Sequence, residues 1–154
     1  MAAMTVLVTT VPLLLLIAAA MTALVVREFA SRGRQRIVGA LVERAELLRF
    51  EAANLDLVRL RLSAAEQALP DDRLRHQLTT QATLAQCEAH WREGSTTDAE
   101  VRTTADRILS SGPVRAWWAE TGRSHGPLTA DLPGRRFHQL VDSSYIAAPP
   151  APPR

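Results

Sequence analysis

The sequence predicts an all-α protein, in which an N-terminal transmembrane helix is followed by a small cytoplasmic domain of about four to five helices. Three observations predict this class. The first 26 residues contain no ionisable side chain, and a group of arginines follows at once. Beyond them, apolar residues recur at helical spacing between caps and breaks. No segment alternates apolar and polar residues at the period of two that a half-buried strand requires.

Residues 1–26 predict the membrane anchor. Thr5–Val26 is an uncharged run of 22 residues, which as a helix is about 33 Å long and can cross a hydrocarbon core of about 30 Å. A cleaved secretory signal, with its site at Ala18–Ala20, is the alternative. Signal peptides carry basic residues before the apolar run, whereas here they follow it. Basic residues near the end of a span stay in the cytoplasm. We therefore expect a single-pass plasma-membrane protein with its N-terminus outside and its C-terminal domain in the cytoplasm.

Residues 27–36 form a basic juxtamembrane segment with four arginines, Arg27, Arg32, Arg34 and Arg36. We expect these arginines to set the topology. Contact with anionic lipid head groups is the alternative, because each arginine near such a surface gains about 1 kcal/mol. The whole chain has 18 basic residues, all of them arginine, against 16 acidic residues. This near balance argues against nucleic acid as a partner, and the single cysteine excludes an intrachain disulfide.

The predicted helical domain covers residues 37–146 and opens with a helix that runs from Arg34 to Leu69. Within this helix a leucine recurs every seven residues, as in a coiled-coil seam: Leu41, Leu48, Leu55, Leu62 and Leu69. The second seam position is poor, and further apolar residues widen the stripe. A wide stripe favours packing against the chain's own core. A parallel homodimer through the Leu41–Leu69 seam is the alternative.

Local start and stop signals predict the next two helices. Pro70 ends the long helix, and Asp71 or Asp72 caps the helix that continues to Gly94. The third helix opens at a capping box, Thr97-x-x-Glu100.

Similar signals predict the end of the domain. Pro113 starts a short helix that Gly122 closes, and Asp131 or Pro133 starts the last helix. The tail over residues 147–154 contains four prolines. It is predicted to be disordered or to form polyproline II.

The C-terminal third carries a pattern of aromatic and basic residues: Arg115-Ala116-Trp117-Trp118, Gly122, Arg136-Phe137, Val141-Asp142 and Tyr145. In this pattern the chain resembles an uncharacterised actinobacterial family of membrane-anchored helical proteins, catalogued as the domain of unknown function numbered 6082. The likeness covers Leu41 to Ile146 and is strongest from Ala105 to Tyr145. The resemblance implies the same architecture, and it implies no activity because none is established for the family.

Few residues suggest a chemical site. Cys87 and His90 are three residues apart on one face of a predicted helix, but zinc needs three or four ligands. We therefore expect a buried thiol beside a satisfied histidine. His125 and His138 flank a loop, and a solvated loop is favoured there over a phosphate or acidic-peptide pocket. The basic residues of this region are Arg123, Arg135 and Arg136. We predict no catalytic residue, no cofactor and no metal.

The tandem Trp117-Trp118 is the most unusual local feature. Adjacent residues on a helix point about 100° apart. We therefore expect one indole to be buried and the other to lie at the edge of the core, covered by Phe137 and Tyr145. A structural aromatic core is favoured over an exposed anchor for a protein partner, although tryptophan and arginine are enriched at interface hot spots. The candidate interaction residues are Arg115, Trp117, Trp118, Arg136, Phe137 and Tyr145.

Together these patterns predict a membrane-anchored helical protein that serves interaction or signalling at the membrane and has no evident catalytic site. Its expected partners are the membrane, with anionic lipid contact, and a protein that the sequence does not name. Two alternatives stay open. One is a structural homodimer organised by the Leu41–Leu69 helix, and the other is an enzyme whose site is not visible in the sequence.

Overall fold

The computed structural model describes residues 2–62, 67–123 and 130–147, and for residues 2–17 and Thr121 it describes the backbone alone. Every regular element in this part of the chain is a helix, so the all-α prediction is confirmed. The chain divides into two compact units, Met1–Ile37 and Val38–Arg154. The proline-rich tail predicted over residues 147–154 lies outside the described residues, apart from Ala147.

Helix α1 covers Ala2–Ala53, so it continues through the predicted anchor and the basic segment into the helical domain. Within the part of the chain that the structure describes, no helix is long and apolar enough to cross a membrane. The predicted span, Thr5–Val26, lies mostly on residues whose side chains are outside that part. The large apolar side chains described nearby are exposed: Met21, Leu24, Val25, Val26 and Phe29.

The prediction of one helix from Arg34 to Leu69 is wrong. Helix α1 ends at Ala53, and the short α2 covers Leu55–Arg59. Asn54 lies between them with φ −125° and ψ 60°, and its side-chain Nδ2 donates a hydrogen bond to the carbonyl of Phe50, at 2.8 Å. An asparagine side chain that bonds to nearby backbone competes with helical hydrogen bonding, which explains the break. The predicted seam is therefore interrupted: Leu41 and Leu48 lie on α1, Leu55 lies on α2, and Leu62 and Leu69 lie outside both helices.

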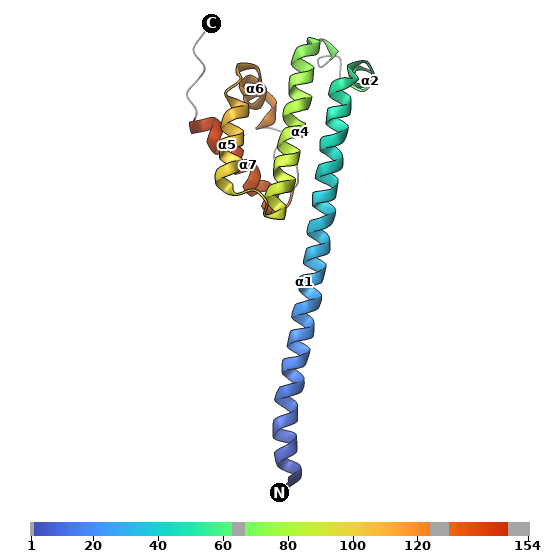
Figure 1. Cartoon of the computed structure of the whole chain (residues 1–154), viewed down its shortest axis with the longest axis vertical. Helices are drawn as coiled ribbons and strands as arrows, with labels where there is room; N and C mark the ends of the chain where they lie inside the picture. The colour runs from blue at the N-terminus through green and yellow to red at the C-terminus, as the bar shows by residue number, and fades with distance from the viewer. Residues whose placement is uncertain (1, 63–66, 124–129, 148–154) are drawn as a thin grey trace. The chain divides into compact units, whose positions relative to one another are not determined.

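Helix α4 (Asp71–Glu93) is the centre of the helical domain, with a different apolar cluster on each side (Figure 1). On one side it packs against the C-terminal part of α1 and against α2. The favoured interpretation of the leucine pattern is thus confirmed for Leu48 and Leu55, which are buried within the chain. It is wrong for four residues that widen the stripe, which are exposed: Leu47, Phe50, Leu57 and Leu60. The cluster on this side of α4 consists of Leu48, Ala52, Leu55, Val58, Leu74, Leu78 and Ala82.

The second cluster joins α4 to the rest of the domain. It includes residues of α5 (Asp98–Leu109), α6 (Gly112–Trp117), the π-helical turn η1 (Trp118–Gly122) and α7 (Leu132–Ala147). From α4 it takes Leu84, and Cys87 and Trp91 pack against its edge. The domain is therefore built in three layers, with α4 as the middle one.

Three of the predicted caps are correct, whereas the closure of the short helix by Gly122 is wrong, because α6 ends at Trp117 and Gly122 is the last residue of η1. Gly94 ends α4 with φ 84°, a left-handed conformation that glycine adopts without strain. The capping box of α5 is formed: the Glu100 amide donates to Thr97 Oγ1 and the Thr97 amide donates to Glu100 Oε2. Asp131 caps α7, because its Oδ1 accepts a hydrogen bond from the Gly134 amide at 3.0 Å.

The predicted cap of α4 is wrong. Pro70 occupies the N-cap position, and no side chain caps this end through a hydrogen bond. Asp71 and Asp72 lie in the first turn instead, where their negative charge is favourable beside the positive end of the helix dipole.

Candidate interaction site

Trp117 and Trp118 are both buried, with 8% and 4% of their surface exposed. The expectation that one of them lies at the edge of the core is therefore wrong. Their rings meet nearly edge to face, with centroids 6.0 Å apart. A π-helical turn begins at Trp118, and α7 covers that side of it. From α7, the His138 ring lies 5.2 Å from the Trp118 ring, and Asp142 accepts a hydrogen bond from the indole nitrogen at 3.3 Å.

Beside this core lies a partly exposed group that we call the Tyr145 cluster: Arg115, Arg123, Asp142 and Tyr145. The guanidinium carbons of Arg115 and Arg123 lie 4.4 Å and 5.3 Å from the centroid of the Tyr145 ring. Arg115 also donates to the backbone carbonyl of Tyr145 at 2.9 Å, and Arg123 pairs with Asp142 at 2.8 Å. Stacking of a cation on an aromatic ring contributes about 0.5–2 kcal/mol. The cluster is thus held in one arrangement by several contacts.

A second group joins α4, α5 and α7 and is called the Trp91 cluster: Trp91, Asp98, Arg136 and Phe137. Asp98 accepts a hydrogen bond from the Trp91 indole at 2.7 Å and another from Arg136 at 2.8 Å. The indole N–H and then the guanidinium hold the pKa of Asp98 below its usual value. The Trp91 and Phe137 rings are 5.9 Å apart, while the Arg136 side chain is 65% exposed.

A buried ionic group ties α4 to the start of α7. Arg92 donates to Glu88 at 2.7 Å and to both carboxylate oxygens of Asp131, at 2.6 Å and 2.7 Å. The Glu88 side chain is fully buried and that of Arg92 is 4% exposed. This group is absent from the sequence prediction. The spacing of Glu88 and Arg92 is the ordinary four residues of a helical ion pair, but Asp131 is 39 positions further along the chain and only the fold brings it near.

The residues considered for a metal or a phosphate site do not come together into one site among the described residues. Cys87 is half-buried and His90 is exposed, so the expected buried thiol is buried only in part. Burial, and then the charge of Glu88, raise the pKa of the Cys87 thiol. Among the described residues, no three His, Cys, Asp or Glu side chains are grouped so that they could hold a metal ion. His125 lies outside the described residues, and His138 stacks on Trp118.

The predicted interaction residues therefore separate into two sets. The first set is core: Trp117, Trp118 and Phe137. The second set reaches the surface in whole or in part, and consists of Arg115, Arg136 and Tyr145. An aromatic anchor made of the two tryptophans is not available at the surface.

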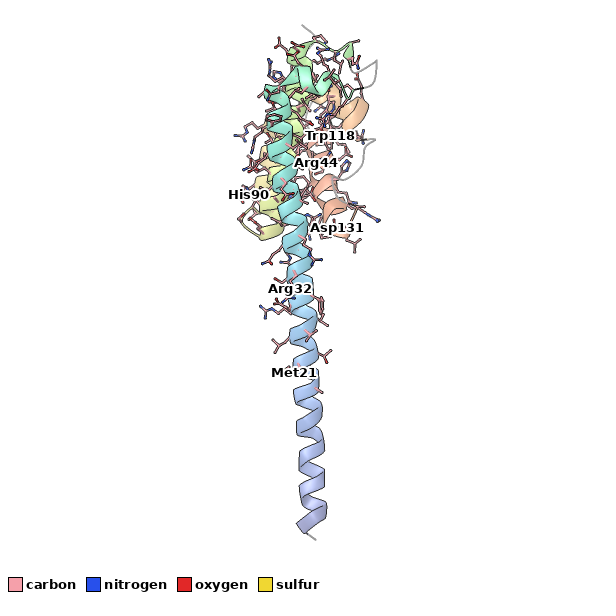
Figure 2. All side chains as sticks on the ribbon, turned by 90° about the vertical axis from the view of Figure 1, so that its right-hand side faces the viewer. Met21, Arg32, Arg44, His90, Trp118 and Asp131 are labelled. Carbon is pink, nitrogen blue, oxygen red and sulfur yellow. The ribbon has the colours of Figure 1, made fainter. Side chains whose placement is uncertain are left out.

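The four arginines that the sequence analysis predicts to lie beside the membrane are all exposed on α1: Arg27, Arg32, Arg34 and Arg36. Figure 2 labels Met21, one of the exposed apolar residues of α1, and Arg32, which lies further from the N-terminus on the same helix. The Arg32 Nε lies 3.0 Å from Glu28 Oε1, one helical turn earlier, and both side chains are more than 60% exposed. Such an exposed pair contributes little to stability.

The model of DUF6082, a family of unknown function, matches residues 2–154. No curated protein and no solved structure is significantly similar to the chain.

Proposed function

This chain belongs to the family DUF6082, and we propose that it is a single-pass membrane protein that presents a helical interaction domain to a protein partner at the cytoplasmic face. The N-terminal part of α1 serves as the anchor, and the domain from Val38 onward carries the recognition surface.

The exposed apolar side chains near the N-terminus are the observation that carries this proposal. Five of them are between 49% and 70% exposed: Met21, Leu24, Val25, Val26 and Phe29. At about 100° per residue they cover about 200° of the helix circumference. One covering helix could not bury so wide an arc, whereas a lipid environment surrounds a helix on every side. The sequence supports the same proposal, because residues 1–26 contain no ionisable side chain.

Two features of the domain support an interaction role. Arg123 and Tyr145 in the Tyr145 cluster, and Arg136 in the Trp91 cluster, present arginine and tyrosine at the surface, and these residue types are enriched at interface hot spots. Both clusters are already fixed by ion pairs and ring contacts. A prearranged side chain loses less conformational entropy on binding than a mobile one.

Extraction and topology measurements test the anchor. The full chain should stay in the membrane pellet after alkaline carbonate extraction, and a variant without residues 1–26 should move to the supernatant. A reporter fused to the C-terminus should be active only if it is of the type that works in the cytoplasm. Release of the full chain by carbonate, or activity of an exterior-type reporter, would refute the proposal.

Site-specific photo-crosslinking tests the interaction role. A photoreactive residue in place of Arg123, whose guanidinium lies over the Tyr145 ring, should give a discrete cross-linked product in the native host, and Tyr145→Ala should remove that product. The same residue in place of the exposed Arg107 on α5 is the control. Equal products from both positions would indicate simple proximity and contradict a specific surface.

A structural homodimer is the second candidate, and one observation favours it. Four large apolar side chains on α1, on α2 and at the C-cap of α2 are more than half exposed: Leu47, Phe50, Leu57 and Leu60. If they form a dimer contact, the double variant Leu47→Glu/Phe50→Glu should make the full chain monomeric in detergent. Leu55 is not suitable for this test, because it is buried within the domain.

A further inference from the structure

We infer that the four juxtamembrane arginines form a collar around α1 that binds the phosphates of anionic phospholipids in preference to zwitterionic ones. This inference rests on the proposed membrane anchor and names its lipid partner. It goes beyond a role of the arginines in topology, which requires positive charge but no particular placement around the helix.

The placement follows from the helical backbone. Helix α1 runs without a break through residues 27–36, so the directions of the side chains are fixed at about 100° per residue. Arg27 and Arg34 then lie within about 20° of each other, and Arg32 and Arg36 lie within about 40°. The two pairs are on nearly opposite faces, about 170° apart. All four side chains are exposed.

Opposite placement distinguishes between two ways of meeting a membrane. A helix that lies on a surface places its basic residues along one face, because the other face points to water. A helix that passes through the head-group layer meets lipid phosphates on every side. Two arginine pairs on opposite faces suit the second geometry, and α1 continues helically on both sides of the collar.

The charge of the segment is only weakly compensated. Residues 27–36 contain four arginines and one acid, Glu28, which pairs with Arg32. The residues three or four positions from Arg34 are Ala30, Ser31, Ile37 and Val38, none of them acidic. Between Phe29 and Ile37 the residues other than arginine are Ala30, Ser31, Gly33 and Gln35. These mostly short side chains leave room for a phosphate close to the helix, and a Cβ at Gly33 would meet nothing within 4 Å.

Native mass spectrometry of the full chain tests the collar. The protein is released from detergent micelles that contain equal amounts of phosphatidylglycerol and phosphatidylcholine, and the retained lipids are counted. We expect the wild type to retain phosphatidylglycerol selectively. Arg27→Gln/Arg34→Gln and Arg32→Gln/Arg36→Gln should each lower its affinity roughly thirty-fold, which corresponds to about 1 kcal/mol per arginine. The matched control, Arg44→Gln/Arg107→Gln, removes two exposed arginines outside the collar, so it changes the net charge by the same amount and should keep the preference.

Each outcome decides a separate point. Loss of the preference in both arginine variants supports the collar. Loss in only one of them would indicate a one-sided stripe and overturn it, as would equal retention of the two lipids by the wild type. Membrane extraction of the same proteins separates this test from the proposed function. A chain that stays in the pellet without lipid preference refutes the collar alone, whereas a chain that carbonate releases refutes the anchor itself.

Discussion

Trp117 and Trp118 are adjacent in the sequence, yet both indoles reach the same apolar cluster, because α7 packs over the π-helical turn that begins at Trp118. Side chains of neighbouring helical residues point about 100° apart, so a core on one side of the helix could bury only one of the two indoles. Here α7 supplies a second packing surface, and both indoles are buried. The aromatic residues thus belong to the core, while the arginines beside them reach the surface in whole or in part.

Replacement of either tryptophan by alanine should therefore destabilise the domain strongly. We expect a loss of about 3–5 kcal/mol for Trp117→Ala and a similar loss for Trp118→Ala, since each removes a large buried side chain. Chemical denaturation of a fragment of residues 34–154 measures both. Leu132→Ala, at a 78% exposed position, is the control and should change stability by less than about 0.5 kcal/mol. A small loss at one tryptophan would contradict the packing described above.

Asp98 should make the stability of the domain depend on acid pH. Its folded-state pKa is held below the unfolded value of about 3.9. The stabilisation is therefore complete above that value and is lost as the pH falls through the folded-state pKa. Asp98→Asn should lower the free energy of unfolding at neutral pH, and the difference from wild type should vanish at strongly acid pH. Denaturation curves across this range measure the effect. Asp106→Asn on the same helix is the control, and an equal pH dependence in both variants would contradict the assignment.

At the scale of elements, the boundaries that depend on neighbouring residues were predictable. Gly94, the Thr97 capping box and Asp131 all act within about one turn of the helix they delimit, and each lies where the sequence places it. The break at Asn54 was not predicted, because the residues around it favour a helix. The hydrogen bond from the Asn54 side chain to the Phe50 carbonyl competes with helical hydrogen bonding there. Ion pairs between residues far apart in the sequence could not be predicted either, because no local pattern shows that Arg92 pairs with Asp131.

The exposure of the candidate interaction residues could not be predicted from the sequence. The sequence pattern selected Arg115, Trp117, Trp118, Arg136, Phe137 and Tyr145. The structure brings these residues into the α6–α7 region and into the neighbouring Trp91 cluster. Which of them reach the surface depends on how α7 covers η1, and that is a tertiary property.

Gly122 is the position at which the packing of η1 can be tested. A Cβ built there would lie 2.5 Å from Cε3 and 2.9 Å from Cδ2 of the Trp118 ring, and the His138 ring, with its centroid 5.2 Å away, limits movement of the indole. We expect Gly122→Ala to lower the free energy of unfolding by about 1–3 kcal/mol through overpacking.

The control for Gly122 is a second glycine in an open environment. A Cβ at Gly39 on α1 would meet nothing within 4 Å. Gly39→Ala should therefore stabilise the helix by about 0.5–1 kcal/mol. Thermal or chemical denaturation of the two variants should show opposite signs, and stabilisation by both would refute the close contact with Trp118.

At the scale of the whole molecule, the domain from Val38 onward contains both apolar clusters. Residues 34–146 should therefore fold without the membrane and without a metal. Circular dichroism should show a helical fragment with a cooperative thermal transition that a chelator does not change. A non-cooperative transition would mean that a partner or the bilayer completes the core. The exposed side chains of Leu47, Phe50, Leu57 and Leu60 would then be the first surface to examine.

The buried position of Arg92 has a consequence for chemical labelling. The chain contains no lysine, so amine-directed reagents find no side chain to modify, whereas dicarbonyl reagents attack guanidinium groups. Arg136, with its exposed side chain, should be modified quickly, while Arg92, which is 4% exposed, should react only in molecules whose domain has opened. Mass spectrometry of the two sites over time would therefore report surface reactivity at Arg136 and the frequency of unfolding at Arg92. Equal rates at both sites would show that the Glu88–Arg92–Asp131 group opens without unfolding of the domain.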